Sequence, residues 1–292
     1  MFKGSLVALV TPFDSSNRVD FACLKSLIDF HVDAGSDGLV VAGTTGEAAT
    51  LTRDEHEELI ERAVELAAGR VPVIAGTGSN STAQTIDLSR AIGRSGIDAY
   101  LLVVPYYNKP PQRALSAHFR TVADAVDCPI LLYNVPSRTG VDLVPETVAE
   151  LATVRNIVGI KEASARLERV GELRRRCGSE FVLLSGDDAT AAAFMLAGGD
   201  GVVSVTANVV PHRMRCLCDA ARSGDIETAR ALDRELVPLN QALFVESNPI
   251  PVKWALQRMG RIESGIRQPL VNLAEVHRAA VESALKVLGV VE

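Results

Sequence analysis

The feature that most constrains the fold is a regular alternation between short apolar runs and longer helical patterns. Each run is rich in aliphatic and β-branched residues, and each leads through a turn into an amphipathic segment. Continuous apolar runs of this length are typical of parallel strands that are buried on both faces. The runs are Ser5–Val10, Gly38–Val41, Val71–Ala75, Ala99–Val104, Pro129–Tyr133, Ile157–Lys161, Phe181–Ser185 and Gly201–Val205.

Helix start signals fill the intervals between the runs. Thr52 and Glu55 have the spacing of a capping box, which predicts a helix beginning directly after Thr52. Ser81 or Thr82 begins the next predicted helix, and Pro145 stands where a first helical residue is expected. Eight such strand–helix units predict an α/β fold, a (β/α)8 TIM barrel. An open doubly wound sheet is the alternative, but regular units without a long crossover favour the closed barrel.

Helical patterns alone follow the last apolar run. They span residues 208–222, 225–244, 249–258 and 272–288. The first pattern completes the barrel, and the other three predict a C-terminal three-helix appendage. We therefore expect a barrel carrying the active site over residues 1–224 and a helical region over residues 225–292. No stretch rich in Gly, Pro or Ser separates the two regions, so we expect no mobile linker.

Charge and hydropathy argue against several classes of partner. The formal net charge is -6, and the dense basic runs, residues 174–176 and Arg213 with Arg215, lie on helical patterns. We therefore expect no nucleic-acid-binding face. The apolar start of the chain reaches Pro12 and Asp14 too soon to span a bilayer, so we expect no membrane association. Five cysteines without a C-x-x-C pair are typical of reduced thiols in a cytoplasmic protein.

Metal and nucleotide signals are weak in this sequence. All five histidines fall in helical patterns, and Asp187-Asp188 is the only acidic pair at the end of a predicted strand. The glycine-rich segment Gly76–Asn80 is not a complete dinucleotide-binding fingerprint. We therefore expect neither a metal ion nor a cofactor.

A single lysine stands at the end of a predicted buried strand. In a (β/α)8 barrel the active site lies at the C-terminal ends of the strands, and Lys161 ends one of them. Burial disfavours the charged form of an amine, and a neutral amine attacks carbonyl carbon. The sequence therefore predicts that Lys161 attacks a carbonyl carbon and forms a Schiff base. A lysine at the rim, paired with Glu162 or Asp187, is the alternative.

Further polar residues follow other predicted strands. Tyr133 ends the strand before that of Lys161, and its phenol could shuttle protons; a core tyrosine is the alternative. Thr44 and Thr45 lie between two glycines and offer hydroxyl and N–H donors to a carboxylate; a tight helix-capping turn is the alternative. The guanidinium of Arg138 suits a second carboxylate, whereas a lone loop arginine is often only a surface charge.

At these positions the chain resembles the dihydrodipicolinate synthase family of lysine-imine barrels, over essentially its whole length. Arg138 and the segment Glu246–Lys253 favour the synthases over N-acetylneuraminate lyase and the 2-keto-3-deoxy-sugar-acid aldolases of the same superfamily. A non-catalytic keto-acid sensor is the remaining alternative. The matching segments are Gly43–Glu47, Leu102–Pro110, Tyr133–Gly140, Gly159–Ala163, Ser185–Asp188 and Glu246–Lys253.

The resemblance implies a reaction and a role for each site residue. Pyruvate condenses with L-aspartate 4-semialdehyde to give 4-hydroxy-tetrahydrodipicolinate, the first committed step of diaminopimelate and lysine biosynthesis. Lys161 is implied to form the imine. Tyr133, Thr44 and Tyr107 are implied to form a proton relay, with Tyr107 supplied across a dimer interface. The implied substrate-binding residues are Thr45 for the pyruvate carboxylate, Arg138 for the semialdehyde carboxylate, and Gly186 and Val203.

The resemblance also implies a homo-oligomer, usually a dimer of dimers, and an L-lysine site at the dimer interface. Lysine-sensitive bacterial members commonly have histidine at the place of Arg53 and glutamate at the place of Gln84. This chain has a cation and a neutral amide there, so we expect weak inhibition by L-lysine or none. The matching positions are Ala48, Ala49, Arg53, His56, Asn80, Gln84 and Tyr106.

Overall fold

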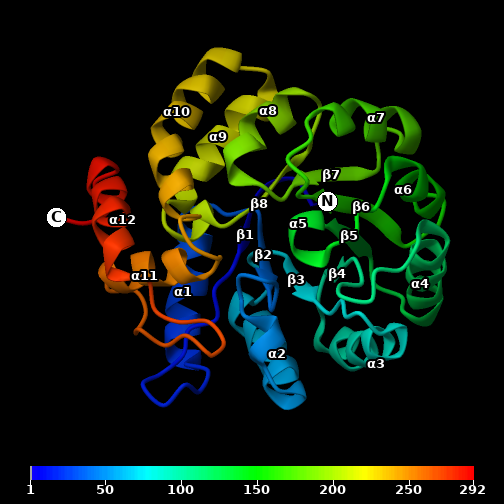
Figure 1. The fold of residues 1–292 in the computed structure, drawn as a ribbon, viewed down its shortest axis with the longest axis horizontal. Coiled ribbons are helices and arrows are strands. Elements are labelled where there is room, and N and C mark those ends of the chain that lie inside the picture. The colour runs from blue at the N-terminus through cyan, green and yellow to red at the C-terminus, as the bar shows by residue number, and fades with distance from the viewer. Residues whose placement is uncertain (1) are drawn as a thin grey trace.

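The structure is a computed structural model that describes residues 2–292, and it contains a closed parallel barrel. Within these residues the strands pair in chain order, and β1 pairs with β8 to close the ring (Figure 1). The predicted (β/α)8 barrel is therefore confirmed, and the open sheet is wrong. The strands are β1 (Gly4–Ala8), β2 (Gly38–Val41), β3 (Val73–Gly76), β4 (Ala99–Val103), β5 (Ile130–Asn134), β6 (Ile157–Glu162), β7 (Val182–Ser185) and β8 (Gly201–Ser204).

Helices connect successive strands and surround the barrel (Figure 1). They are α1 (Phe21–Asp33), α2 (Arg53–Ala67), α3 (Thr82–Ile92), α4 (Gln112–Ala125), α5 (Pro136–Thr139), α6 (Pro145–Leu151), α7 (Glu168–Cys177), α8 (Ala191–Leu196), α9 (Pro211–Ser223), α10 (Ile226–Ala242), α11 (Ile250–Arg258) and α12 (Glu275–Val287). Short 3-10 turns lie at η1 (Ala48–Thr50), η2 (Gly93–Ser95), η3 (Asp188–Thr190) and η4 (Thr206–Asn208).

The predicted helix starts are confirmed, and each has a local cause. The Thr52 hydroxyl accepts from the Glu55 backbone N–H at 3.2 Å, and the Glu55 carboxylate accepts from the Thr52 N–H at 2.9 Å. This reciprocal pair is the capping box that begins α2. Ser81, rather than Thr82, caps α3, and Pro145 is the first residue of α6.

Apolar side chains fill two separate layers, because successive strand residues point to opposite faces. One layer fills the inside of the barrel and includes Leu6, Val40, Tyr133, Leu184 and Val203. The other layer lies between the strands and the surrounding helices. A side chain at the C-terminal end of a strand therefore faces either the mouth of the barrel or the helical shell, according to its parity.

Three helices after α9 form the predicted C-terminal appendage, at one side of the barrel (Figure 1). Helix α10 packs against α9 and α12, and α11 packs against α12 and η4. Across residues 2–292, no helix combines the length and apolarity that crossing a membrane requires.

Candidate active site

Lys161 lies inside the barrel, near the C-terminal end of β6. The register pairs Lys161 with Tyr133 of β5 and with Leu184 of β7, so its side chain shares the inner face with both. The residue is 7% exposed, and its Nζ lies 4.3 Å from the centroid of the Tyr133 ring. The predicted neighbours are thus brought together in space, an amine against a phenol.

Gly186 lies beside the side chain of Lys161, where the absence of a Cβ leaves space for it. A Cβ added at Gly186 would lie 3.0 Å from Cε and 3.1 Å from Cγ of Lys161, and 2.6 Å from Cβ of Ala163. Any side chain at this position would therefore clash with Ala163 and press on the side chain of Lys161, which would have to shift. This contact gives Gly186 a physical role, in addition to the substrate-binding role that the sequence suggested.

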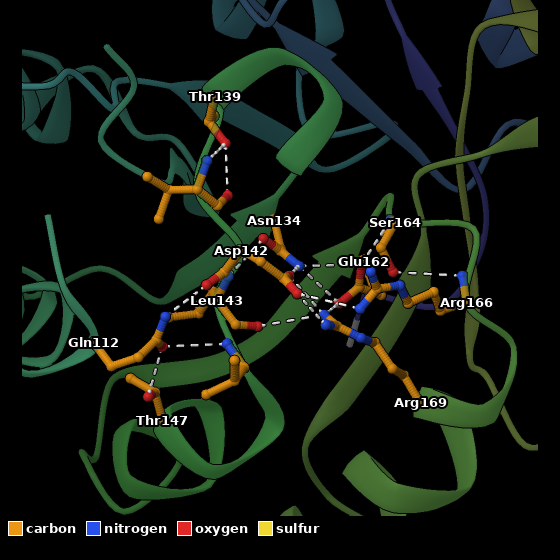
Figure 2. Close-up of polar contacts among 12 residues, drawn as sticks. Gln112, Asn134, Thr139, Asp142, Leu143, Thr147, Glu162, Ser164, Arg166 and Arg169 are labelled. Carbon is orange, nitrogen blue, oxygen red and sulfur yellow. Dashed lines mark hydrogen bonds and ion pairs between the residues drawn. The ribbon is translucent and has the colours of Figure 1, made fainter. Parts of the chain in front are cut away.

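Glu162 points into the helical shell, because it follows Lys161 by one residue on the same strand. Its carboxylate accepts from Arg169 Nη1 at 3.2 Å, from Asn134 Nδ2 at 3.1 Å and from the Ser164 N–H at 2.7 Å (Figure 2). Within residues 2–292 no carboxylate lies within ion-pair distance of Lys161. A rim lysine paired with Glu162 is therefore wrong.

Asp187, the second partner considered for Lys161, is also occupied elsewhere. Its Oδ2 accepts from the Thr190 N–H at 3.0 Å and from the Thr190 hydroxyl at 2.6 Å, which caps η3. The amine of Lys161 therefore remains available to a substrate.

The ends of β5 and β6 are joined by a polar cluster of Asn134, Asp142, Glu162 and Arg169 (Figure 2). Arg169 Nη1 and Asn134 Nδ2 donate to Asp142 Oδ1 at 2.8 and 2.9 Å. Burial acts to raise the pKa of Asp142, but the hydrogen bonds from Arg169 and Asn134 lower it overall. Because Asn134 and Glu162 directly follow Tyr133 and Lys161, this cluster fixes the strand ends that carry the amine and the phenol.

The turn after β2 contains the two predicted threonines. Thr45 is 3% exposed, and its hydroxyl oxygen accepts from Asn248 Nδ2 at 2.9 Å, whereas Thr44 is partly exposed. The Thr11 hydroxyl, at the end of the segment after β1, donates to the Gly46 carbonyl at 2.7 Å. The turn is therefore held from both sides, by the segment after β1 and by the chain before α11.

Arg138 lies in the short helix α5 and reaches the same segment. Its Nη2 donates to the backbone carbonyl of Asn248 at 3.2 Å, although the residue as a whole is exposed. Asn248 thus touches both of the predicted carboxylate-binding residues, Thr45 and Arg138. Asn248 carries no signal of its own in the sequence, and only the resemblance of the segment Glu246–Lys253 pointed to this region.

A buried ion pair was also missed. Lys253 of α11 donates to the Glu47 carboxylate and, at 3.0 Å, to the Thr11 carbonyl. Burial lowers the pKa of Lys253, and the Glu47 carboxylate opposes that shift. Glu47 also accepts from the Arg267 N–H at 2.9 Å, so two C-terminal residues hold the end of the threonine turn.

Two further predicted site residues, Val203 and Tyr107, lie on other elements of the barrel. Val203 lies on β8 and packs in the inner layer with Tyr133. Tyr107 lies in the loop after β4, has a φ of 73° and is 88% exposed. Within residues 2–292 its hydroxyl forms no hydrogen bond, and the structure does not place it beside Lys161.

The predicted regulatory residues line the region between α2, α3 and the loop after β4. Arg53 is held by Glu57 and, at 2.7 Å, by Asp87, rather than extending freely. His56 is buried with Nε2 at 2.8 Å from the Gly76 carbonyl, and burial lowers its pKa. The other contacts are Gln84 Oε1 with the Ser79 hydroxyl at 3.0 Å and the Asn80 carbonyl with Asn108 Nδ2 at 2.8 Å; Ala49 and Tyr106 are exposed.

Among residues 2–292, no group of three or more His, Cys, Asp or Glu side chains could hold a metal ion. The structure brings the amine of Lys161 against the phenol of Tyr133, and the turn with Thr44 and Thr45 follows β2 at the same end of the parallel barrel. This set suits covalent attack on a carbonyl with proton transfer by hydroxyl groups.

Comparison with known proteins gives matches along the whole chain. The model described as the dihydrodipicolinate synthetase family matches residues 1–288. A relative from Alcanivorax borkumensis, named 4-hydroxy-tetrahydrodipicolinate synthase, is 55% identical over 292 residues, covering 100% of this chain and 99% of its own. A relative of the same name from Pseudomonas savastanoi pv. phaseolicola is 54% identical over 290 residues, covering 99% of both.

A solved structure is similar to the whole fold. It is the chloride-inhibited dihydrodipicolinate synthase from Acinetobacter baumannii, complexed with pyruvate. It superposes with a TM-score of 0.98 at 46% identity and covers 100% of both chains.

Proposed function

The chain belongs to the dihydrodipicolinate synthetase family, and from this premise we propose that it condenses pyruvate with L-aspartate 4-semialdehyde. The product is 4-hydroxy-tetrahydrodipicolinate, and the reaction is the first committed step of diaminopimelate and lysine biosynthesis. The observation that carries the proposal is the buried amine of Lys161, which lies against Tyr133 without a carboxylate partner in residues 2–292. The pyruvate complex of the Acinetobacter baumannii relative supports the same first substrate.

The first stage forms the imine. The unprotonated Nζ of Lys161 attacks the keto carbon of pyruvate, and the keto oxygen leaves as water after taking up protons. The Tyr133 hydroxyl donates and recovers these protons, and Thr44 and Tyr107 pass them onward. Thr45 and the backbone of its turn bind the pyruvate carboxylate with hydroxyl and N–H donors.

The second stage forms the carbon–carbon bond and releases the lysine. The imine withdraws electrons from the methyl carbon, which loses a proton and becomes the nucleophilic end of an enamine. That carbon attacks the aldehyde, whose oxygen takes up a proton, while Arg138 binds the second substrate's carboxylate. The amine of the second substrate then attacks the imine carbon, displaces Lys161 and closes the six-membered ring. Gly186 and Val203 line the space that these intermediates occupy.

We also propose that the protein is cytoplasmic and works as a homo-oligomer, a dimer of dimers. The exposed ring of Tyr107 supports this assembly, because a loop tyrosine with a positive φ and no internal partner suits insertion into a neighbouring subunit. In that arrangement each site receives its third relay group from the partner.

Borohydride trapping tests the proposal directly. Pyruvate with borohydride reduces the imine to a stable secondary amine, so we expect a covalent adduct on Lys161 by peptide mass spectrometry. Lys161→Ala should abolish the adduct, whereas Lys286→Met, at an exposed position of α12, should leave Lys161 labelled. Labelling of the wild type elsewhere, or equal labelling of Lys161→Ala, contradicts the mechanism.

A further inference from the structure

Asn248 lies at the contact point between the two predicted carboxylate-binding residues. It comes between α10 and α11, is 6% exposed, and is separated from Thr45 by 203 positions in the chain. Its Nδ2 donates to the Thr45 hydroxyl oxygen at 2.9 Å, and its backbone carbonyl accepts from Arg138 Nη2 at 3.2 Å. One residue therefore contacts both carboxylate-binding side chains, through different atoms.

The direction of the hydrogen bond to Thr45 matters for anion binding. A hydroxyl carries one hydrogen and two acceptor lone pairs. Because the Thr45 oxygen accepts from the Asn248 amide, its own hydrogen remains free, and within residues 2–292 no acceptor uses it. A carboxylate needs donors, so a threonine held in this state is prepared to bind one.

We infer that Asn248 is a positioning residue that keeps the Thr45 hydroxyl turned as a donor toward the carboxylate of the keto acid. The inference rests on the proposed function and adds to it a group that none of the sequence motifs assigned. Within residues 2–292 Thr45 is the only hydrogen-bond partner of the Asn248 side chain, since the amide Oδ1 is buried and unpaired. A change of side chain at this position therefore acts on Thr45, while the backbone contact with Arg138 persists.

The neighbouring structure holds Asn248 in place. Its segment is closed by the Ile250 N–H, which donates to the Ser247 carbonyl at 2.9 Å. The following helix is tied to the same turn by Lys253, which donates to Glu47 and to the Thr11 carbonyl. The amide is therefore presented to Thr45 by a fixed backbone, which is what a positioning role requires.

The test measures the dependence of imine trapping on pyruvate concentration, which does not involve the second substrate. Asn248→Ala frees the Thr45 hydroxyl to turn, and we expect about a tenfold higher half-saturating pyruvate concentration, the value of roughly one hydrogen bond to a charged group. Asn248→Asp, of nearly the same shape, accepts instead of donating and takes the Thr45 hydrogen, so the rise should be larger. The concentration of semialdehyde needed for half-maximal turnover should change less, because Arg138 contacts the backbone.

Thr45 variants separate positioning from a general loss of structure. In a Thr45→Ser background the hydroxyl remains, and Asn248→Ala should still raise the pyruvate requirement. In a Thr45→Val background there is no hydroxyl to orient, and Asn248→Ala should add little. An equal effect in both backgrounds, or no effect of either Asn248 variant in a chain whose Lys161 is labelled, overturns this inference alone. A wild-type chain that is not labelled at Lys161 overturns the proposed function and the inference together.

Discussion

Two adjacent residues, Lys161 and Glu162, serve opposite sides of one strand. Side-chain alternation sends the lysine to the barrel mouth and the glutamate into the helical shell, where Arg169 neutralises it (Figure 2). A shift of β6 by one residue relative to β5 would exchange these surroundings and place an acid at the site of imine formation. The free amine is therefore a consequence of register as much as of residue type.

The phenol of Tyr133 supplies a prediction at this scale. Tyr133→Phe keeps the ring packed against Lys161 but removes the proton shuttle, so we expect activity to fall by about 10²–10⁴-fold with little change in stability. Steady-state kinetics and thermal unfolding measure the two effects. A loss of activity below about threefold contradicts a relay role.

Tyr100 is the matched control for that variant. It is a buried tyrosine of β4 whose hydroxyl donates to the Ser89 carbonyl at 2.7 Å, in the layer between the strands and the helices. Tyr100→Phe should lower stability by about 1–3 kcal/mol, because a buried acceptor loses its partner, and should leave kcat nearly unchanged.

At the scale of elements, α11 is tied to the turn after β2. The Glu47–Lys253 ion pair and the Asn248–Thr45 hydrogen bond join segments more than 200 positions apart. We propose that the division into a barrel, residues 1–224, and a helical region, residues 225–292, describes the order of elements along the chain. The two regions are not independent in structure, because Asn248 and Lys253 of the helical region contact Thr45 and Glu47 in the turn after β2.

Lys253→Met tests this connection. The variant keeps the volume of the side chain but leaves the Glu47 carboxylate buried without its cation, so we expect a loss of about 3–5 kcal/mol. Urea unfolding measures the loss, and Lys286→Met, at an exposed position of α12, should cost less than about 0.5 kcal/mol. The double variant Glu47→Gln with Lys253→Met should recover part of the stability. If Lys253→Met is no more destabilising than Lys286→Met, the ion pair does not hold the turn.

At the scale of the whole molecule, the sequence predicts the repeated strands and helices, but it does not predict individual contacts between distant segments. The eight strands and the capping of α2 follow from local periodicity, and Lys161 and Tyr133 follow from their places at strand ends. Asn248 and Lys253 could not be found in that way. Their partners lie about 200 positions away, and a single long-range contact leaves no periodic signal in the chain.

Assembly is testable by mixing two inactive variants. If Tyr107 serves the partner's site, Tyr107→Phe chains lack a relay group in every homodimer, and Lys161→Ala chains lack the nucleophile. Mixed dimers contain one site with Lys161 from one chain and Tyr107 from the other, so activity should reappear up to about a quarter of the wild-type level. Mixtures that stay as inactive as their components contradict the exchange. Lys161→Ala chains that also carry Tyr107→Phe are the negative control.

Feedback by L-lysine is expected to be weak. Gln84 offers a neutral acceptor where a carboxylate would pair with an ammonium, and this loss of a charge partner weakens lysine binding. Arg53 replaces a histidine, although Glu57 and Asp87 both pair with its guanidinium. We expect half-inhibition above about 0.5 mM in a titration of activity. Gln84→Glu should tighten lysine binding by about 1 kcal/mol, or roughly fivefold. Half-inhibition of the wild type well below that concentration contradicts this interpretation.

The buried ion pair also bears on the order in which a growing chain matures. All strands of the barrel precede residue 205, whereas Asn248, Lys253 and Arg267 leave the ribosome later. Until they arrive, the Glu47 carboxylate has no cation and stays in water, since an unpaired charge is costly to bury. A nascent barrel can therefore close around its apolar interior while the threonine turn after β2 still lacks these contacts, and the turn takes its final form only after α11 has been synthesised.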